Sequence, residues 1–222
     1  MTGFGRCAMA LGMLVSVAAA EPPPAPIPVP VEESVLTEIN YVRAHPHDYA
    51  DELRRYRDFF DGRVVRLPGD PVGELTREGT DAVDEAITFL DRQSPLPPLA
   101  NGRLLSLAAQ DLAEDQGATG YNGHRSSDGA MPGDRVKRRG GDIFVSETIS
   151  YGYDRPDDVV RQLIVDDGVP SRGHRSLIFA AGNRFAGVGC GEHPRVRYMC
   201  VIDYSATATG APQLPTFAAS SR

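Results

Sequence analysis

Hydrophobic positions in the first part of the chain recur at the spacing of amphipathic helices. Ser34 is a favourable N-cap for a first helix, and Pro46 suits the first turn of a second one. The apolar face of the first helix carries Val35, Ile39 and Val42. The stripe of the second helix carries Tyr49, Leu53, Tyr56 and Phe60. We expect both faces to lie in the hydrophobic core.

Two more helices follow after a loop that is rich in glycine and proline, at residues 61–75. The first begins at Thr80 and ends before Ser94-Pro95, with acidic residues in its first turn. The second runs from about residue 102 to 116, and Gly117 is expected to end it.

The strands are expected in the second half of the chain. Residues 143–145 and 148–151 have the β-branched and aromatic composition of strands, and residues 156–167 return to a helical pattern that Gly168 ends. Residues 185–190 and 196–204 predict a β-hairpin. This order predicts an α/β domain with helices on both faces of a small sheet.

The N-terminal segment indicates export. Residues 1–20 combine Arg6, an apolar run and a final Ala-Ala-Ala, which is the pattern of a cleaved signal peptide. A retained anchor is the alternative, although the run is shorter than the roughly 20 residues of a membrane span. We expect a proline-rich linker at 21–33, one domain at 34–205 and a flexible tail at 206–222, without a transmembrane span in the mature chain. The expected location is extracellular or periplasmic.

The charge balance argues against a nucleic-acid partner. The formal net charge is −7, and no basic stripe is present to neutralise phosphates. The one local basic cluster, at residues 135–139, is interpreted as a solvated loop or helix end.

Cysteine usage fits an oxidising compartment. Cys7 leaves with the signal peptide, so Cys190 and Cys200 remain as an even number. A hairpin turning near residue 195 places them opposite each other, and we therefore predict a disulfide between them.

Two of the five histidines stand out as candidates for chemistry. His124 and His174 each lie in a Gly-His-Arg segment, where the backbone can approach a cleft closely. The other three have simpler roles near a helix start or a hairpin turn: His45, His47 and His193.

Three carboxylates are candidate partners of these histidines. Glu147 lies between apolar residues, so it faces either water or an internal polar site. Asp166 and Asp167 lie at a helix C-terminus, where an anion needs a cationic partner. No zinc-protease, nucleophile-elbow or phosphate-loop motif is present, and the serines near the histidines are weak candidates for a nucleophile: Ser126, Ser127 and Ser171.

In this order, the motifs resemble those of the CAP superfamily, also called SCP-like or cysteine-rich secretory proteins, and most closely its bacterial secreted branch. The resemblance covers residues 34–205. It rests on Glu-Ile-Asn-Tyr-Val-Arg at 38–43, Gly-His at 123–124, Arg135, Glu147, Gly-His-Arg at 173–175, Gly-Val-Gly at 187–189 and the closing strand at 199–204.

This resemblance implies an α-β-α sandwich, with a small and mostly antiparallel sheet between helices. It also implies a central cavity lined by two histidines and two acidic residues. Matched by position, these are His124, His174, Glu147 and a residue before Gly168, for which we choose Asp167 over Asp166. Members of the family hold a divalent metal, often zinc, on the histidine pair, and some bind sterols or other lipids.

The chain departs from the family pattern in four places. Ser146-Glu147-Thr148 replaces Gly-Glu-Asn, an aspartate replaces the second glutamate, no tryptophan is present and one disulfide remains. The first two changes affect the geometry of the cavity.

Three functions are compatible with these residues. The first is an extracellular binding module whose ligand is a lipid, a sterol or an envelope component. The second is a metal-dependent hydrolase of peptides or esters, with Glu147 and Asp167 as acid and base. The third is a polar cluster that only stabilises the fold. The sequence leaves the oligomeric state open.

Overall fold

The protein is an α-β-α sandwich, as predicted. The computed structural model describes residues 30–213, so the expected signal peptide, the linker up to residue 29 and the tail from residue 214 lie outside the described residues. Four strands form the central sheet in the order β4-β6-β7-β5, in which only the β4–β6 pair is parallel. Their bounds are β4 Ala100–Asn101, β5 Ser146–Tyr151, β6 Phe185–His193 and β7 Arg197–Ser205.

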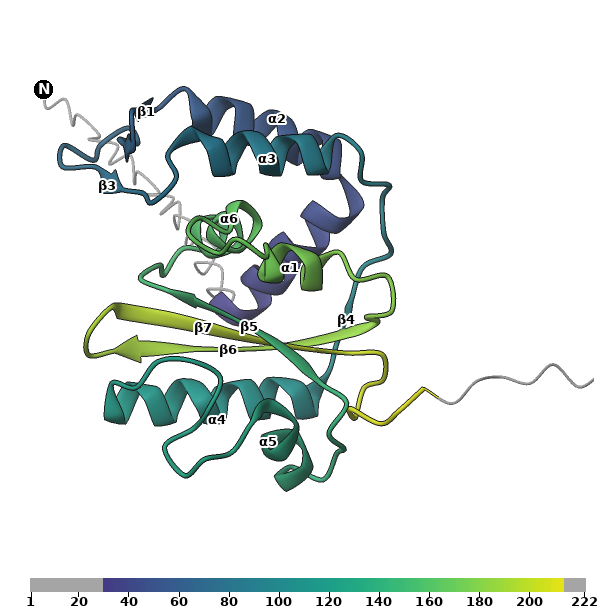
Figure 1. Cartoon of the computed structure of the whole chain (residues 1–222). Helices are drawn as coiled ribbons and strands as arrows, with labels where there is room; N and C mark the ends of the chain where they lie inside the picture. Colours follow the sequence, from purple (N-terminus) through teal and green to yellow (C-terminus); the bar gives the residue numbers. More distant parts are fainter. Residues whose placement is uncertain (1–29, 214–222) are drawn as a thin grey trace, which may run out of the picture.

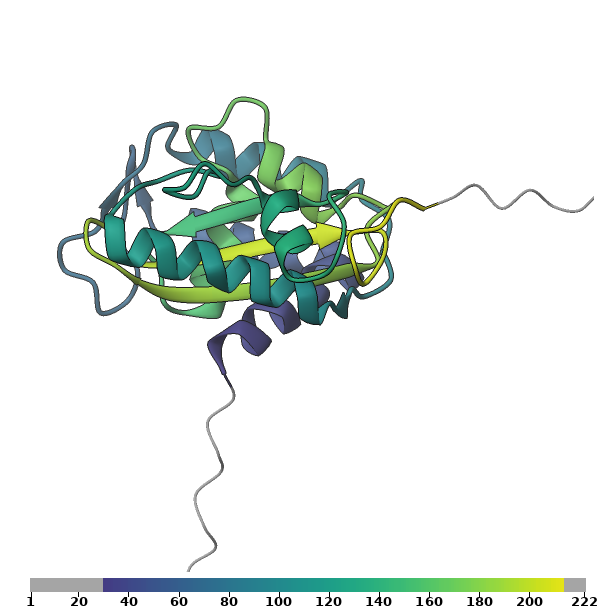
Figure 2. The same cartoon turned by 90° about the horizontal axis from the view of Figure 1, so that it is seen from below.

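Helices cover both faces of this sheet (Figure 1). One face is covered by α4 (Arg103–Thr119) and α5 (Pro132–Arg138), which lie in front of the strands in Figure 2. The other face is covered by α1 (Val31–Ala44), α6 (Pro156–Val165) and α7 (Gly173–Ile178). Two helices form a further layer outside these, α2 (Pro46–Arg57) and α3 (Thr80–Leu90).

Two glycines let α4 lie unusually close to the sheet. A Cβ atom at Gly187 would lie 2.0 Å from the backbone nitrogen of Ser106, and one at Gly189 would lie 2.3 Å from that of Gln110. No side chain fits at these distances, so the Gly-Val-Gly segment of β6 fixes the separation between strand and helix.

A small second sheet lies beside α2 and α6. It consists of β1 (Phe60–Asp61), β2 (Val64–Val65) and β3 (Glu74–Leu75), all antiparallel. Except for Phe60, these residues lie in the segment 61–75 that was predicted to be a loop. Phe60 therefore belongs to a strand rather than to the stripe of the second helix. It still packs against the main core.

Several predicted boundaries are wrong. Helix α4 continues past Gly117 and ends at Gly120, which has the left-handed conformation with φ 72°. Residues 143–145 are not a strand, and the short helices α5 and α7 were not predicted. Each of these helices has at most seven residues, too few to show a hydrophobic period.

The predicted boundaries of the linker and of the tail are wrong where each adjoins the domain. Helix α1 begins at Val31, so the last three residues of the expected linker at 21–33 are helical. At the other end, the carbonyls of Thr209 and Gly210 accept hydrogen bonds from the backbone of Asp142 and Phe144. The first residues of the expected flexible tail therefore belong to the domain.

The predicted disulfide is confirmed. Cys190 and Cys200 are direct cross-strand partners, with Cα atoms 4.2 Å apart. Within residues 30–213, no helix is both long and apolar enough to cross a membrane.

Candidate functional site

The two histidines singled out in the sequence meet at one pocket. Its volume is about 210 Å³, and it opens between the loop after α4 and the segment that joins α6 to α7. Its lining consists of Gly123, His124, Ile149, Tyr151, Gln162, Leu163, Asp166, Asp167, Val169 and His174. Segments fifty residues apart thus bring both imidazoles to one polar hollow with an apolar wall. We call it the histidine pocket.

The loop that carries His124 is held in place by hydrogen bonds of both backbone groups of the neighbouring Gly123. The backbone N–H of Gly123 donates to the Tyr151 hydroxyl at 2.8 Å, and its carbonyl accepts from Gln116 Nε2 at 2.5 Å. Tyr151 in turn donates to Gln116 Oε1 at 2.8 Å. Helix α4 and strand β5 therefore position this loop together, which the sequence did not reveal.

His124 rests on a buried carboxylate. Its Nδ1 lies 2.7 Å from Oε1 of Glu147, whose side chain is 1% exposed. Sequence left open which way Glu147 faces, and the structure shows that it faces inward. Arg135 donates to the other carboxylate oxygen, so both oxygens of Glu147 are engaged.

The interpretation of residues 135–139 as a solvated basic cluster is wrong for Arg135. This arginine is 1% exposed, and it also donates to the carbonyls of His124 at 3.1 Å and Ala130 at 3.2 Å. The positive charge of this buried guanidinium compensates the negative charge of the buried Glu147 carboxylate. Its burial could be suspected from the family resemblance, but not from the local composition.

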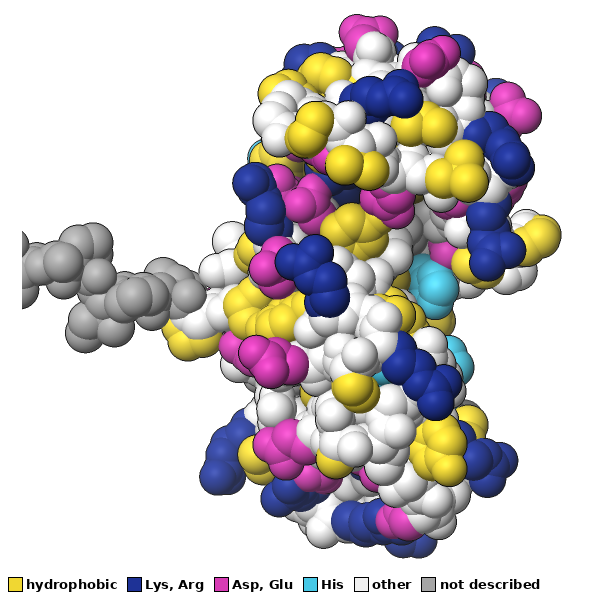
Figure 3. Space-filling view, turned by 90° about the vertical axis from the view of Figure 1, so that its left-hand side faces the viewer, with side chains coloured by type: hydrophobic (Ala, Val, Ile, Leu, Met, Phe, Trp, Pro, Cys, Tyr) yellow, Lys and Arg dark blue, Asp and Glu magenta, His cyan; other side chains and the backbone are white. Residues whose placement is uncertain are grey.

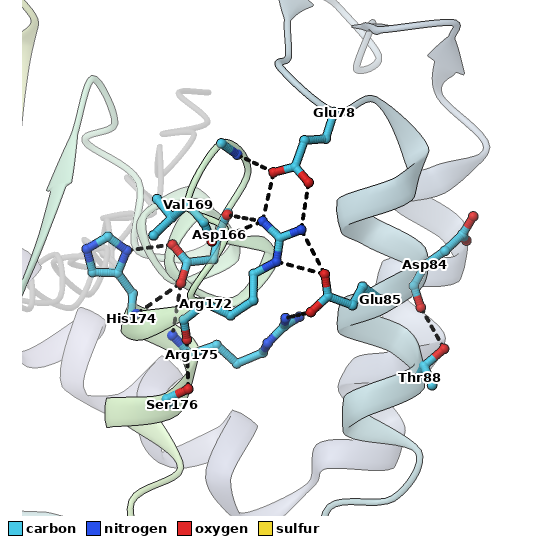
Figure 4. A network of polar contacts seen from close by, with 11 residues as sticks. Glu78, Asp84, Glu85, Thr88, Asp166, Val169, Arg172, His174, Arg175 and Ser176 are labelled. Carbon is cyan, nitrogen blue, oxygen red and sulfur yellow. Dashed lines mark hydrogen bonds and ion pairs between the residues drawn. The ribbon is translucent and has the colours of Figure 1, made fainter.

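His174 has an equivalent arrangement, with Asp166 as the carboxylate. Nδ1 of His174 lies 2.6 Å from Oδ1 of Asp166, and the backbone N–H of His174 donates to Oδ2 at 2.9 Å (Figure 4). Asp166 is 2% exposed and ends α6 in the left-handed conformation, with φ 59°.

The choice of Asp167 as the carboxylate that pairs with the histidines is therefore corrected to Asp166. The left-handed turn at residue 166 directs that side chain toward α7. Asp167 borders the same pocket, but its carboxylate accepts from the backbone N–H groups of Arg77 at 2.7 Å and Glu78 at 2.8 Å. It ties the segment between β3 and α3 to the end of α6.

A network of charged side chains between the start of α3 and the start of α7 supports this turn (Figure 4). Arg172 bonds both oxygens of Glu78 and one oxygen of Glu85, and it also donates to the carbonyl of Asp166 at 2.8 Å. The hydrogen bonds from Arg172 lower the pKa of Glu78 to about 2. Arg175 donates to the second oxygen of Glu85 at 2.9 Å. Arg172 thus supplies the cation that the helix C-terminus was expected to need.

Both histidines are bound to their carboxylates through the same nitrogen. A carboxylate only accepts hydrogen bonds, so each Nδ1 carries the proton of a neutral ring and each Nε2 keeps its lone pair. No hydrogen bond within residues 30–213 uses either Nε2. The same residues contain no group of three or more His, Cys, Asp and Glu side chains placed to hold a metal. The described part of the chain therefore offers two imidazole Nε2 atoms at this pocket, which is the donor chemistry of a borderline metal such as zinc.

Asp203 is a second buried carboxyl group that the sequence did not single out. It is fully buried on β7, directly across from Glu147, and neither of its oxygens has a hydrogen-bond partner among residues 30–213. Burial, and then the charge of Glu147, raise the pKa of Asp203 well above its usual range. Asp203 is thus the cross-strand neighbour of Glu147, the residue that binds His124.

Two of the three serines near the histidines, Ser126 and Ser127, have structural partners. Ser126 accepts a hydrogen bond from Arg135 at 3.3 Å, and the Ser127 hydroxyl donates to Asp115. The other histidine of the second half, His193, is buried and binds the carbonyl of Tyr121 through Nε2 at 3.0 Å. These contacts hold loops in place.

One family profile and two solved structures are similar to this chain. The profile described as "CAP: Cysteine-rich secretory protein family" matches residues 36–204. A search of curated proteins finds no match. Among solved structures, an extracellular protein containing an SCP domain from Bacillus anthracis is 21% identical, with a TM-score of 0.41, over 50% of this chain and 34% of that one.

A second solved structure, an outer surface protein from Borrelia burgdorferi, is 18% identical with a TM-score of 0.41. It is matched over 49% of this chain and 77% of that one. The chain thus spans about a third of the length of the Bacillus protein.

Proposed function

This chain belongs to the cysteine-rich secretory protein (CAP) family, and from that premise we propose that it is an extracellular binding module whose histidine pocket takes a divalent metal and an apolar ligand. One observation carries the proposal: two imidazoles line one pocket, and each is held through Nδ1 by its own buried carboxylate. Such pairs orient a ring and raise its basicity toward a metal, which a merely structural histidine does not need.

The metal would be held by Nε2 of His124 and Nε2 of His174. Zinc suits imidazole ligands, and two of them give weaker and more exchangeable binding than the three or four of tight sites. When bound, the metal would supply a Lewis acid that polarises a ligand oxygen. The chain itself orients the rings through Glu147 and Asp166.

The rest of the pocket suits an apolar group. Ile149, Leu163 and Val169 form part of its wall, together with polar side chains. A volume of about 210 Å³ is below that of typical small-molecule sites, so the pocket would take the end of a lipid or of an envelope component. The polar head would then meet the histidines.

A metal-dependent hydrolase is the second candidate, and the histidine–carboxylate pairs favour it. Each pair would hold a metal ligand in place, and the side chain of His124 is 47% exposed to an approaching substrate. Glu147 itself is a poor candidate for the base, because both of its oxygens are engaged and it is buried. Because Nε2 of both histidines would hold the metal, the proton would be taken by Asp167, which also borders the pocket.

Zinc titration of the purified domain by calorimetry tests the binding proposal. We expect one zinc per chain and a loss of about tenfold or more in affinity in both His124→Ala and His174→Ala. His45→Ala, at an exposed histidine outside the pocket, is the matched control and should leave the affinity unchanged. Zinc affinity that stays unchanged in both pocket variants would contradict the proposal.

Two further readouts separate the alternatives. Turnover of model esters or peptides by the zinc-loaded protein, lost in His124→Ala, would favour the hydrolase. A lower melting temperature in His174→Ala, without any effect on zinc or lipid binding, would favour the purely structural cluster.

A further inference from the structure

A second cavity of about 280 Å³ lies next to the histidine pocket, between the small sheet β1–β3 and helix α6. The two share Gln162 and Asp167 as a common wall, and no histidine lines the second one. The small sheet lies in the upper left part of Figure 1, so its side is the one seen in Figure 3, where hydrophobic side chains lie among acidic and basic ones. We call this second hollow the aromatic cavity.

Its wall combines aromatic rings with carboxylates. Tyr56, Phe60 and Tyr153 supply the rings, and Val65 and Val165 supply aliphatic surface. Tyr56 and Phe60 meet edge to face, with ring centroids 5.2 Å apart. The acidic residues of the wall are Asp70, Glu74, Asp158 and Asp167, against a single basic residue, Arg161.

One aromatic face of the cavity already holds a cation. The guanidinium carbon of Arg161 lies 4.7 Å from the centroid of the Tyr56 ring, and Asp158 pairs with the same guanidinium. That carboxylate therefore offsets the charge of Arg161. The other three carboxylates leave the remaining wall negative.

These three carboxylates are tied to separate parts of the chain and do not converge as metal ligands. Asp70 accepts from the backbone of Val72 and Gly73 at 3.0 Å, and Asp167 accepts from the backbone of Arg77 and Glu78. Glu74 accepts the Tyr153 hydroxyl at 2.5 and 2.6 Å. The backbone hydrogen bonds also lower the pKa of Asp70, so it remains ionised.

Together with aromatic faces, such spread negative charge favours an organic cation over a compact metal ion. A methylated ammonium group is large, weakly hydrated and attracted to ring faces, and it needs no directed hydrogen bonds. An anion would be repelled by the wall, and a neutral group would gain nothing from the carboxylates. We propose that the aromatic cavity is a second binding site, for a small organic cation of the quaternary ammonium class.

Choline and its neutral carbon isostere, 3,3-dimethylbutan-1-ol, test this proposal on the unaltered protein. Val65 and Val165 line the cavity, so their methyl resonances report binding in an NMR titration. We expect saturable shifts with choline and at least about tenfold weaker binding of the isostere, which has the same shape without the charge. Equal affinities, or no saturable shift with choline, would overturn the proposal.

Variants locate the site. Glu74→Gln and Phe60→Leu should each weaken choline binding several-fold, because one removes a charge and the other an aromatic ring of the wall. Asp61→Asn removes an exposed charge from the same sheet, outside the cavity, and should leave the affinity unchanged. Choline affinity unaffected by both cavity variants would place the ligand elsewhere.

The proposal stands independently of the metal. His174→Ala should bind choline as the unaltered protein does, because His174 does not line the aromatic cavity. A loss of zinc binding together with retained choline binding would therefore separate the two sites, and loss of choline binding in this variant would contradict a separate site.

Discussion

Replacing Asp203 by asparagine should stabilise the protein near neutral pH. The Asp203 carboxyl is fully buried, lacks hydrogen-bond partners in the described part of the chain and lies across from Glu147, so its ionisation places two negative charges together in the interior. An asparagine amide has nearly the same shape, carries no charge and offers N–H donors toward Glu147.

The size of the effect follows from proton linkage. Because the pKa of Asp203 is raised in the folded state, the folded protein binds more protons than the unfolded chain above pH about 3.9. The contribution of Asp203 to the free energy of unfolding is fully present below that pH. It declines as the pH rises, until the pH passes the pKa of Asp203 in the folded protein. The loss is about 1.4 kcal/mol for each pH unit in this interval. Asp203→Asn should lack this loss.

Urea unfolding followed by circular dichroism, from pH 4 to pH 8, measures the difference. The free energy of unfolding of Asp203→Asn should increasingly exceed that of the unaltered protein as the pH rises, and then level off. Asp61→Asn, whose carboxylate is 89% exposed, controls for the change in net charge. The reasoning fails if the difference does not depend on pH, or if Asp203→Asn is the less stable protein at pH 7.

Three further changes test other parts of the structure. Arg135→Ala should lower the free energy of unfolding, measured with denaturant, by about 3–5 kcal/mol, because it leaves the buried Glu147 carboxylate without its guanidinium partner. Arg138→Ala, at an exposed arginine, should change it little. Equal effects of the two substitutions would contradict the role of Arg135. Cys190→Ser together with Cys200→Ser should lower the free energy of unfolding by about 2–3 kcal/mol, and an unchanged value would show that the disulfide adds nothing. Gly187→Ala should prevent α4 from packing on β6 and yield insoluble or unfolded protein. Gly182→Ala, with no atom within 4 Å of its Cβ, should fold. A soluble Gly187→Ala protein with an unchanged melting temperature would show that the strand and the helix do not need a glycine at this position.

Much of the fold was predictable because its long elements have clear periods. The helices beginning near residues 34, 46, 80, 102 and 156 and the final hairpin were expected near their observed positions. The disulfide followed from the register of that hairpin. What the sequence did not reveal depends on contacts between distant segments. Arg135 looks like part of a basic surface run until β5 places Glu147 beside it.

The error at Asp167 has a specific backbone cause. The helical pattern before Gly168 does not indicate at which residue the chain leaves α6, and a left-handed aspartate is uncommon. Because the helix ends at Val165, Asp166 rather than its neighbour turns toward His174. A shift of one residue at the helix end thus decides which aspartate binds His174 and which one binds the backbone of Arg77 and Glu78.

X-ray absorption spectroscopy of the zinc-loaded protein counts imidazole ligands directly, and so tests whether His124 and His174 form one metal site through their Nε2 atoms. We predict two imidazoles at the Zn–N distance of about 2.0 Å, falling to one in His174→Ala. Zinc bound without imidazole ligands, or a spectrum that is the same in His174→Ala, would contradict it.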